Sequence, residues 1–383
     1  TVSDVSWSPD GRRIAAWSYS RKIRVWEVET GRCQVVLEAE GDTVSDVSWS
    51  PDGRRIAAWS SGDGGKIRVW EETGRCQVLE AEGDTVSDVG WSSVCCSPPD
   101  GRRIAAWSSG DGQKIWVWEV ETGRCQVLEA EGDTVSNVSW SPDGRRIAAR
   151  SSGDGQKIRV WEVETGRCQV LEAEGDELSD MSWHWSPDGR RIAARSYLYN
   201  KKIWVWEVEL RTGRCQVLEA EGDTVSDVSW SPDGRRIAAR SSGDGGKIRV
   251  WEETGRCQVL EAEGDTVSDV SWSPDGRRIA AWSTGYNKKI RVWEVETGRC
   301  QALFGHKGIV SDVSWGRHAD VLFSFSRDDH CFKCWSRLSD GCFLLSVDLN
   351  CFGNELMFRD ATIDQSIPCS IKEMLEDMGA KSL

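Results

Sequence analysis

The chain repeats one seven-residue motif eight times, and this repetition constrains its fold more than any other feature. The motif Thr-Val-Ser-Asp-Val-Ser-Trp, with small variations, begins at Thr1, Thr43, Thr85, Thr134, Glu177, Thr224, Thr266 and Ile309. Successive copies lie 42 to 49 residues apart. A period of this length is typical of proteins that stack one supersecondary unit on the next. We therefore expect eight equivalent structural units along the chain.

Each repeat has the pattern of four short strands. A Ser-Pro-Asp-Gly turn, a Gly-rich hairpin and a Thr-Gly turn separate segments in which apolar and polar residues alternate. In the second copy, the predicted strands are residues 44–49, 56–60, 66–70 and 76–79. Because each connection is short, consecutive strands must pair with each other. The pattern predicts one four-stranded antiparallel meander per repeat.

The repeats resemble the WD40 family of β-propellers over about residues 1–348. The sequence Trp-Ser-Pro-Asp-Gly-Arg-Arg-Ile-Ala begins at Trp7, Trp49, Trp140, Trp185, Trp230 and Trp272. A tryptophan that closes the third strand stands at Trp26, Trp70, Trp118, Trp161, Trp206, Trp251, Trp293 and Trp335, and the resemblance implies a structural role for it. The resemblance implies an all-β, eight-bladed WD40-type β-propeller of four-stranded antiparallel blades. Seven blades with an extra packed unit is the alternative.

The propeller is predicted over residues 1–348 and a C-terminal extension over 349–383. The expected blades are about residues 1–42, 43–84, 85–133, 134–176, 177–223, 224–265, 266–308 and 309–348. In the extension, a capping box at Ser370 and one apolar stripe predict a short helix at about 371–378. The stripe consists of Ile371, Met374, Leu375 and Met378. We expect this helix either to pack on the propeller or to dock into another subunit.

The chain departs from the polar network that usually ties each WD40 blade together. That network links the third-strand tryptophan, a second-strand hydroxyl, an Asp in the next turn and a His that precedes the blade. Here only His306, followed by Lys307, stands in the histidine position. Six earlier linkers carry a glutamate instead: Glu40, Glu82, Glu131, Glu174, Glu221 and Glu263. We expect these glutamates to be hydrated at the rim or to accept the indole N–H.

The same linkers would form an acidic collar. The chain has 62 Asp and Glu against 48 Lys and Arg, a formal net charge of −14. The resemblance places the Glu-Ala-Glu-Gly-Asp linkers on one face, where they would attract cations or basic segments of partner proteins. A solvated rim that keeps the chain soluble is the alternative. The acidic charge argues against a nucleic-acid partner.

Several residues that depart from the repeat are candidates for partner contact. Insertions introduce Val94, Cys95 and Cys96 in the third repeat and His184, Leu210 and Arg211 in the fifth. Loops that differ from a repeat template are free to take on binding roles. The second strand ends in Trp17, Trp59, Trp107 and Trp282 in some repeats and in Arg150, Arg195 and Arg240 in others. We expect these positions either to form aromatic and basic arcs on the surface or to pack between blades.

Seven of the 14 cysteines stand in one repeated context, Arg-Cys-Gln. They are Cys33, Cys76, Cys125, Cys168, Cys215, Cys257 and Cys300. One thiol per repeat cannot form a disulfide within its repeat, so we expect small buried apolar residues in a reducing intracellular compartment, most simply the cytoplasm. No apolar stretch is long enough to cross a membrane. The chain starts at Thr1 in mid-repeat, so we expect its N-terminus to lie upstream, and an N-terminal targeting signal cannot be judged.

No motif points to catalysis, a cofactor or a metal. The four histidines lie outside any nucleophile elbow or zinc-protease helix, and the pair Cys331 and Cys334 falls on a predicted strand. We therefore predict a non-enzymatic protein–protein interaction scaffold within a multi-protein complex. The alternatives are a structural subunit of a large assembly and the ligand-sensing propeller of a longer signalling protein.

Overall fold

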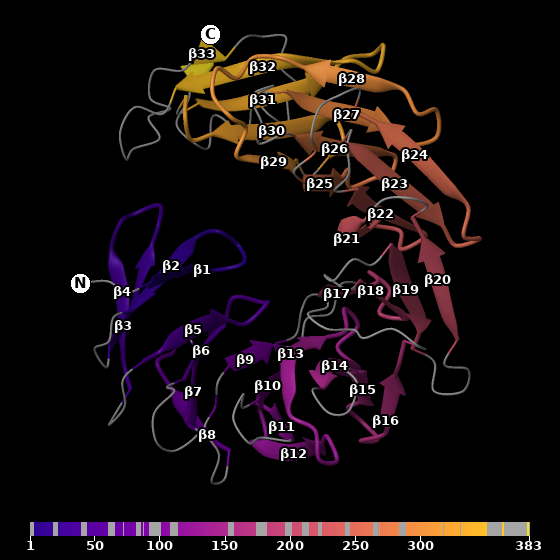
Figure 1. Cartoon of the computed structure of the whole chain (residues 1–383). Coiled ribbons are helices and arrows are strands. Elements are labelled where there is room, and N and C mark those ends of the chain that lie inside the picture. The colour runs from indigo at the N-terminus through magenta and orange to yellow at the C-terminus, as the bar shows by residue number, and fades with distance from the viewer. Residues whose placement is uncertain are drawn as a thin grey trace. The chain divides into compact units, whose positions relative to one another are not determined.

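Each predicted repeat folds as one antiparallel sheet of four strands in chain order (Figure 1). We call these sheets blades 1 to 8 from the N-terminus. In this computed structural model, the described residues are 4–17, 22–39, 44–59, 66–71, 73–81, 86, 88–91, 101–107, 114–151, 157–173, 182–195, 201–208, 214–220, 224–241, 246–262, 267, 269–282, 289–316, 318–329, 331–350, 362–363 and 381–382.

Blades 1 to 4 contain the first 16 strands. These are β1 (Asp4–Trp7), β2 (Arg13–Trp17), β3 (Lys22–Glu27), β4 (Cys33–Glu38), β5 (Asp46–Trp49), β6 (Arg55–Trp59), β7 (Lys66–Glu71), β8 (Cys76–Glu80), β9 (Asp88–Trp91), β10 (Arg103–Trp107), β11 (Lys114–Glu119), β12 (Arg124–Glu129), β13 (Val135–Trp140), β14 (Arg146–Ser151), β15 (Lys157–Glu162) and β16 (Cys168–Leu171).

Blades 5 to 8 follow the same pattern. Their strands are β17 (Ser182–Trp185), β18 (Arg191–Arg195), β19 (Lys202–Glu207), β20 (Cys215–Glu219), β21 (Val225–Trp230), β22 (Arg236–Ser241), β23 (Lys247–Glu252), β24 (Cys257–Glu261), β25 (Asp269–Trp272), β26 (Arg278–Trp282), β27 (Ile290–Glu294), β28 (Cys300–Leu303), β29 (Asp312–Trp315), β30 (Val321–Ser326), β31 (Cys331–Arg337) and β32 (Phe343–Asn350). A short parallel pair, β33 (Thr362–Ile363) and β34 (Lys381–Ser382), belongs to the C-terminal extension.

Eight four-stranded antiparallel sheets confirm the predicted fold class, an eight-bladed β-propeller. The eighth sheet packs as a blade and not as an extra unit. Its first strand β29 contacts β25 of blade 7, in the same way that β25 contacts β21 of blade 6. The alternative of seven blades is therefore wrong. The predicted helix at 371–378 lies outside the described residues.

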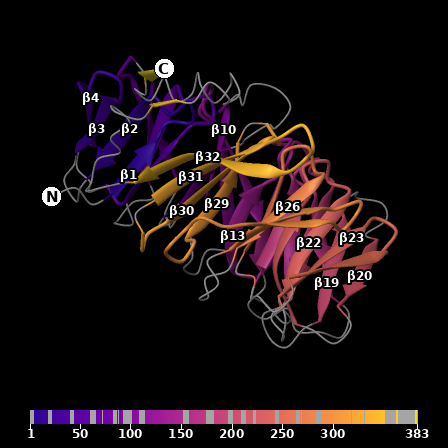
Figure 2. The same ribbon diagram turned by 90° about the horizontal axis from the view of Figure 1, so that it is seen from above.

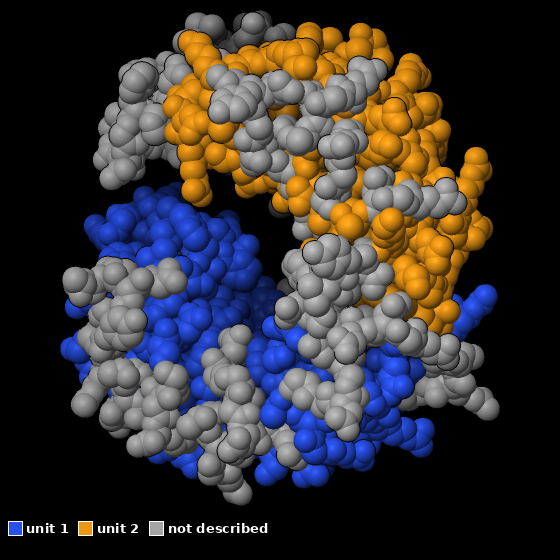
Figure 3. Space-filling view, in the orientation of Figure 1, with its two compact units in different colours: residues 1–179, 188–191, 206–214 blue, residues 180–187, 192–205, 215–383 orange. Residues whose placement is uncertain are grey.

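The chain divides into two compact units, which Figure 3 shows in different colours. The first consists of residues 1–179, 188–191 and 206–214. The second consists of residues 180–187, 192–205 and 215–383. Blades 1 to 4 belong to the first unit and blades 6 to 8 to the second.

The Ser-Pro-Asp-Gly turn explains why the first two strands of a blade pair in one register. In blade 1, the Ser8 hydroxyl donates to Asp10 Oδ1 at 2.6 Å and accepts the Arg13 N–H at 2.9 Å. The pKa of Asp10 lies below its usual value because of the hydrogen bond from Ser8 and a second one from the Arg12 N–H. Gly11 closes the turn with a φ of 70°, a conformation that favours glycine. The same Ser and Asp contact recurs in blades 2, 4, 6 and 7.

The core lies between adjacent blades. Between blades 7 and 8, for example, Trp282, Val292 and Leu303 of one sheet pack against Val313 and Trp335 of the next. Figure 2 shows the strands of these blades stacked side by side. Every buried strand face therefore depends on the neighbouring blade for its apolar contacts, as a repeat architecture requires.

An indole N–H from each of several blades also hydrogen-bonds to the preceding blade. Trp49, at the end of β5, donates to the Ser6 carbonyl at 3.1 Å, and Trp272, at the end of β25, donates to the Ser229 carbonyl at 3.3 Å. Trp91, Trp140, Trp230 and Trp315 make the equivalent bond. The tryptophan that ends the first strand therefore fixes the spacing of adjacent blades within each unit.

Candidate functional site

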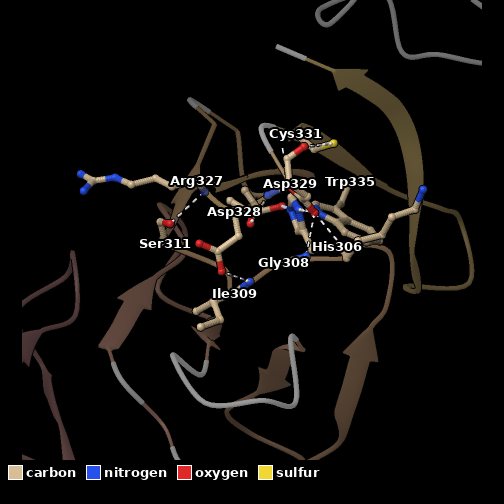
Figure 4. A network of polar contacts seen from close by, with 12 residues as sticks. His306, Gly308, Ile309, Ser311, Arg327, Asp328, Asp329, Cys331 and Trp335 are labelled. Carbon is tan, nitrogen blue, oxygen red and sulfur yellow. Dashed lines mark hydrogen bonds and ion pairs between the residues drawn. The ribbon is translucent and has the colours of Figure 1, made fainter. Parts of the chain in front are cut away.

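A buried polar network holds the linker between blades 7 and 8 (Figure 4). Asp329, in the turn between β30 and β31, accepts the backbone N–H of Lys307 at 2.7 Å and that of Gly308 at 3.1 Å. Its other carboxylate oxygen accepts the N–H of Cys331 at 3.0 Å. One carboxylate thus joins the linker to the hairpin of blade 8.

Gly308 is required by this close approach. A Cβ at this position would lie 2.5 Å from the Cβ of Asp328 and 2.6 Å from the Ser326 hydroxyl. Asp328 adds a further bond, because its carboxylate accepts the N–H of Ile309 at 3.1 Å. The linker backbone is therefore fixed from residue 307 to residue 309.

His306 connects the same carboxylate to the core of blade 8. Its Nδ1 lies 3.2 Å from Asp329 Oδ2 and its Nε2 lies 2.8 Å from the Ser324 hydroxyl. Trp335 Nε1 donates to that hydroxyl at 2.9 Å. An ionised carboxylate can only accept, so Nδ1 carries the proton and Nε2 accepts the Ser324 hydroxyl proton. Blade 8 therefore contains the four-residue network that the WD40 resemblance implied.

Asp329 is ionised throughout the physiological range. Burial would raise its pKa, but the N–H groups of Gly308 and Lys307 and the nearby His306 outweigh burial and lower the pKa to about 2. Backbone N–H groups that point at a carboxylate stabilise its charged form. The network is consequently a fixed negative charge surrounded by donors.

The network presents three exposed side chains to solvent. Phe304 is 66% exposed, and Lys307 and Arg327 are exposed on either side of the fixed linker. The ammonium group of the half-buried Lys289 lies 5.5 Å from the centre of the Phe304 ring. We call Phe304, Lys307, Arg327 and Lys289 the linker platform.

Blades 4 and 5 satisfy the buried indole of the third strand without a histidine. Trp161 donates to the Glu129 carbonyl at 3.3 Å and Trp206 to the Glu172 carbonyl at 3.2 Å. Each acceptor is a backbone carbonyl two residues before a predicted rim glutamate. Glu131, the described member of that set, is exposed at the rim with a φ of 42°. The other five, Glu40, Glu82, Glu174, Glu221 and Glu263, lie outside the described residues.

Blade 4 has a different polar network at the same level. The Ser151 hydroxyl donates to Asp133 Oδ2 at 2.6 Å, and Arg159 makes an ion pair with that oxygen at 2.7 Å. The hydrogen bond from Ser151 and then that from Arg159 lower the pKa of Asp133. An Asp at the end of the acidic linker thus takes over the bridging role that His306 has in blade 8.

The residues that end the second strands are buried and pack between blades. Trp17, Trp59, Trp107, Trp282 and Arg195 are all less than a tenth exposed, and Arg150 and Arg240 are half-buried. Trp17 donates to the Ser45 carbonyl of blade 2 at 3.3 Å, and Arg240 donates to the Val267 carbonyl of blade 7 at 2.9 Å. Trp17 and Arg240 therefore both supply a donor to the next blade, and the burial of all seven residues means that the predicted surface arcs are not formed.

Comparison with known proteins identifies the family. The model of the TolB beta propeller domain (PD40) matches residues 75–319, which is more than half of the chain. The chain belongs to this β-propeller family. The model of the WD domain, G-beta repeat, matches residues 1–27 and 31–71, which confirms the WD40 resemblance.

Solved structures support the propeller fold. One of them, described as the crystal structure of the eukaryotic initiation factor, superposes with a TM-score of 0.65 at 16% sequence identity. The match covers 91% of this chain and 88% of that one. At this identity the likeness concerns the fold alone. A search of curated proteins found no relative.

The propeller buries its third-strand tryptophans. Seven of the eight, Trp70, Trp118, Trp161, Trp206, Trp251, Trp293 and Trp335, are at most 3% exposed, and Trp26 of blade 1 is half-buried. Trp70, for example, packs against the sheet of blade 1 in a cluster with Ile23 and Leu37.

Few of the predicted contact residues from insertions fall within the described part of the propeller. His184 is exposed on β17, and its backbone carbonyl accepts the Trp230 indole at 3.2 Å. Val94, Cys95, Cys96, Leu210 and Arg211 lie outside the described residues, as do Ile371, Met374, Leu375 and Met378 of the predicted helix. The structure therefore brings together only His306 and Lys307 of the predicted contact set.

The seven Arg-Cys-Gln cysteines are exposed, which corrects the prediction that they are buried. Each stands at the first or second residue of the outermost strand of its blade. On that strand the cysteine shares a sheet face with an exposed valine and glutamate, as Cys76 does with Val78 and Glu80. Only the leucine between them is buried. The outermost strand lies at the edge of its sheet, and the face that carries Cys76, Val78 and Glu80 is not covered there, so the cysteine remains in contact with solvent.

Three members of the linker platform, Phe304, Arg327 and Lys289, were not predicted as contact residues. Phe304 replaces the first glutamate of an acidic linker, and Arg327 follows the second strand of the only blade that diverges throughout. An aromatic residue in a linker that is otherwise acidic was the available signal. Among the described residues, no group of three His, Cys, Asp or Glu could hold a metal ion, and no helix could span a membrane.

Proposed function

We propose that this propeller is a non-enzymatic scaffold that binds other proteins, and that the linker platform is one of its docking surfaces. WD40 propeller domains generally mediate protein–protein interaction, and their fold is typically non-enzymatic. The observation that carries the proposal is Phe304, a large apolar ring exposed on a linker that the Asp329 network fixes. A fixed, exposed aromatic side chain beside cations has the composition of a binding hot spot.

The platform selects its partner by charge. Lys307 and Arg327 are exposed, and the carboxylates of Asp328 and Asp329 are engaged by backbone N–H groups beneath them. Asp328 is itself exposed, so the exposed groups are two cations and the Phe304 ring beside one carboxylate. A partner segment with an apolar residue next to a carboxylate would complement both features.

Basic segments of partners remain our proposal for the glutamate linkers. Glu131 supports it, because it is exposed and its charge faces solvent. We also propose that the chain works in a reducing intracellular compartment, because each Arg-Cys-Gln thiol is exposed and would be open to oxidation elsewhere.

The test is recovery of partners by the whole chain carrying Phe304→Ala with Lys307→Glu. We expect these two substitutions to abolish recovery of at least one stoichiometric partner in quantitative mass spectrometry. Leu338→Ala is the matched control, because Leu338 is also an exposed large apolar residue of blade 8 but lies outside the linker. Equal recovery by the unsubstituted chain and the double variant would contradict the platform, and absence of any stoichiometric partner would contradict the scaffold.

A further inference from the structure

A groove between blades 7 and 8 gathers three arginines. Its volume is about 350 Å³, and Arg278, Arg299 and Arg337 line it together with Ser339 and Gly341. Arg278 begins β26, Arg299 precedes β28, and Arg337 ends β31. The size is within the range of small-ligand sites.

Arg278 is buried but makes only long contacts. It is 7% exposed, and its guanidinium lies 3.5 Å from the Ala319 carbonyl and 3.6 Å from Asp275 Oδ2. In blade 1, the equivalent Arg13 donates to the Gly53 carbonyl at 2.8 Å. Blade 8 lacks the Ser-Pro-Asp-Gly turn that supplies this glycine, so the arginine of blade 7 keeps unused donor capacity.

Arg337 lines the same groove and also has hydrogen-bond donors that are not used. Its Nε is buried and has no hydrogen-bond partner among the described residues. Its nearest carboxylate, that of Asp320, is 3.4 Å from another guanidinium nitrogen. The pKa of Arg278 is lowered by burial first and then by the positive charge of Arg337. The two like charges therefore lie close enough to repel each other. Such a pair is costly to bury without an anion between or beside it.

The carboxylates that line the groove are occupied by other donors. Glu294 Oε2 accepts the Thr297 hydroxyl at 2.7 Å and lies 3.7 Å from the Arg299 guanidinium. Asp340 accepts the N–H of Cys342 at 2.9 Å. Neither contact is made with Arg278 or Arg337. Their own carboxylate contacts, with Asp275 at 3.6 Å and Asp320 at 3.4 Å, are long, so each guanidinium keeps N–H groups for a ligand.

The geometry points to an oxyanion site in this groove, in which Arg278 and Arg337 bind a carboxylate or phosphoryl group and Arg299 lies at the mouth. Planar guanidinium groups bind both kinds of oxyanion through paired N–H groups. The site goes beyond the proposed scaffold role, because it would bind a small anion whether or not a protein partner is present.

The equivalent groove between blades 1 and 2 lacks this surplus. It is larger, at about 450 Å³, and Arg13 and Arg54 contribute to its lining. Arg13 is already engaged by the Gly53 carbonyl and lies 5.1 Å from the centre of the Trp49 ring. The repeat therefore produces a groove at both places. Of these two grooves, only the one between blades 7 and 8 keeps open donors, because blade 8 diverges from the repeat.

The experiment is isothermal titration calorimetry of the whole chain at low salt, with inorganic phosphate in one arm and acetate in the other. We expect saturable binding at one site in at least one arm, and the stronger arm identifies the preferred source of the oxyanion. Arg337→Gln should weaken that binding about tenfold, because it removes a charged hydrogen-bond donor. Arg54→Gln, in the groove between blades 1 and 2, is the matched control and should change the affinity less than about twofold.

Two results would overturn the site. One is the absence of saturable binding of both anions. The other is equal affinity of Arg337→Gln and the unsubstituted chain, provided that the variant keeps the near-ultraviolet circular dichroism of the folded protein. Loss of partner recovery does not enter this test, so failure of the scaffold proposal would leave its outcome unchanged.

Discussion

Asp329→Asn tests whether the blade 8 network stabilises the propeller through charge. The carboxylate accepts three backbone N–H groups and faces Nδ1 of His306. A hydrogen bond to a charged group contributes about 1.5–3 kcal/mol and a neutral one about 0.5–1.5 kcal/mol, so neutralising the acceptor costs about 1 kcal/mol per donor. For the three backbone donors and the imidazole, we expect the free energy of unfolding of the unit that contains blade 8 to fall by about 2–4 kcal/mol.

The assay is urea unfolding followed by tryptophan fluorescence. Asp328→Asn is the control, because Asp328 is exposed and accepts the Ile309 N–H alone; we expect it to cost less than about 1 kcal/mol. Asp329 has a folded pKa of about 2, below the ordinary value of 3.8. Its contribution is therefore complete above pH 3.8 and is lost as the pH falls from there towards 2.

Asp329→Asn should remove this part of the acid dependence, whereas Asp328→Asn should keep it. Equal urea midpoints for the two variants would refute the reasoning. So would an Asp329→Asn variant whose stability falls between pH 3.8 and 2 as much as that of the unsubstituted chain.

Three further substitutions or measurements follow from the contacts between blades. Trp272→Phe keeps a buried ring but removes the donor to the Ser229 carbonyl, so urea unfolding should show a loss of about 1 kcal/mol; no loss would mean that the bond is not stabilising. Arg240→Ala removes donors to Ser226 and to the Val267 carbonyl and should cost about 2 kcal/mol, whereas Arg240→Trp, which copies Trp282 of the next blade, should recover most of that; equal stability of the two variants would argue against a shared role. In native protein, a thiol reagent mapped by mass spectrometry should modify the exposed Cys33 and Cys300 well before Cys334, whose thiol is buried and whose pKa burial raises; simultaneous modification would contradict the assigned burial.

The strands were predictable because several independent signals mark them in each repeat and the repeat occurs eight times. Alternation and the Ser-Pro-Asp-Gly turn place four strands in blade 2 at 44–49, 56–60, 66–70 and 76–79, and the structure has Asp46–Trp49, Arg55–Trp59, Lys66–Glu71 and Cys76–Glu80. These differences of one or two residues are small because the turn chemistry fixes the ends of the first two strands. Trp70 lies on β7, an inner strand of the sheet, where the neighbouring blade covers it.

The outermost strand was harder to interpret, because its hydrophobic pattern does not say how much of it is covered. A cysteine in a strand resembles a small core residue by composition. The glutamate four residues later, on the same face, was a better guide, since it must remain hydrated.

Acceptors on the backbone were beyond prediction for another reason. When alanine replaced the second-strand hydroxyl, the sequence offered only side chains as substitutes, yet Trp161 uses the Glu129 carbonyl. A carbonyl is present at every residue and leaves no trace in composition, so only coordinates can identify the one that a donor reaches.

The two proposed surfaces of blades 7 and 8 lie at opposite ends of one strand. Phe304 follows the last residue of β28, whereas Arg299 precedes its first, Cys300. The two residues are five steps apart along the chain, with β28 between them, which separates them by roughly 16 Å at about 3.3 Å per residue. Changes at sites this far apart usually act independently. Phe304→Ala with Lys307→Glu should therefore abolish partner recovery and leave anion affinity unchanged. Arg337→Gln should weaken anion binding about tenfold and leave partner recovery unchanged. If either variant altered both measurements while the protein stayed folded, the platform and the groove would have to be one site, and the separation inferred from β28 would be wrong.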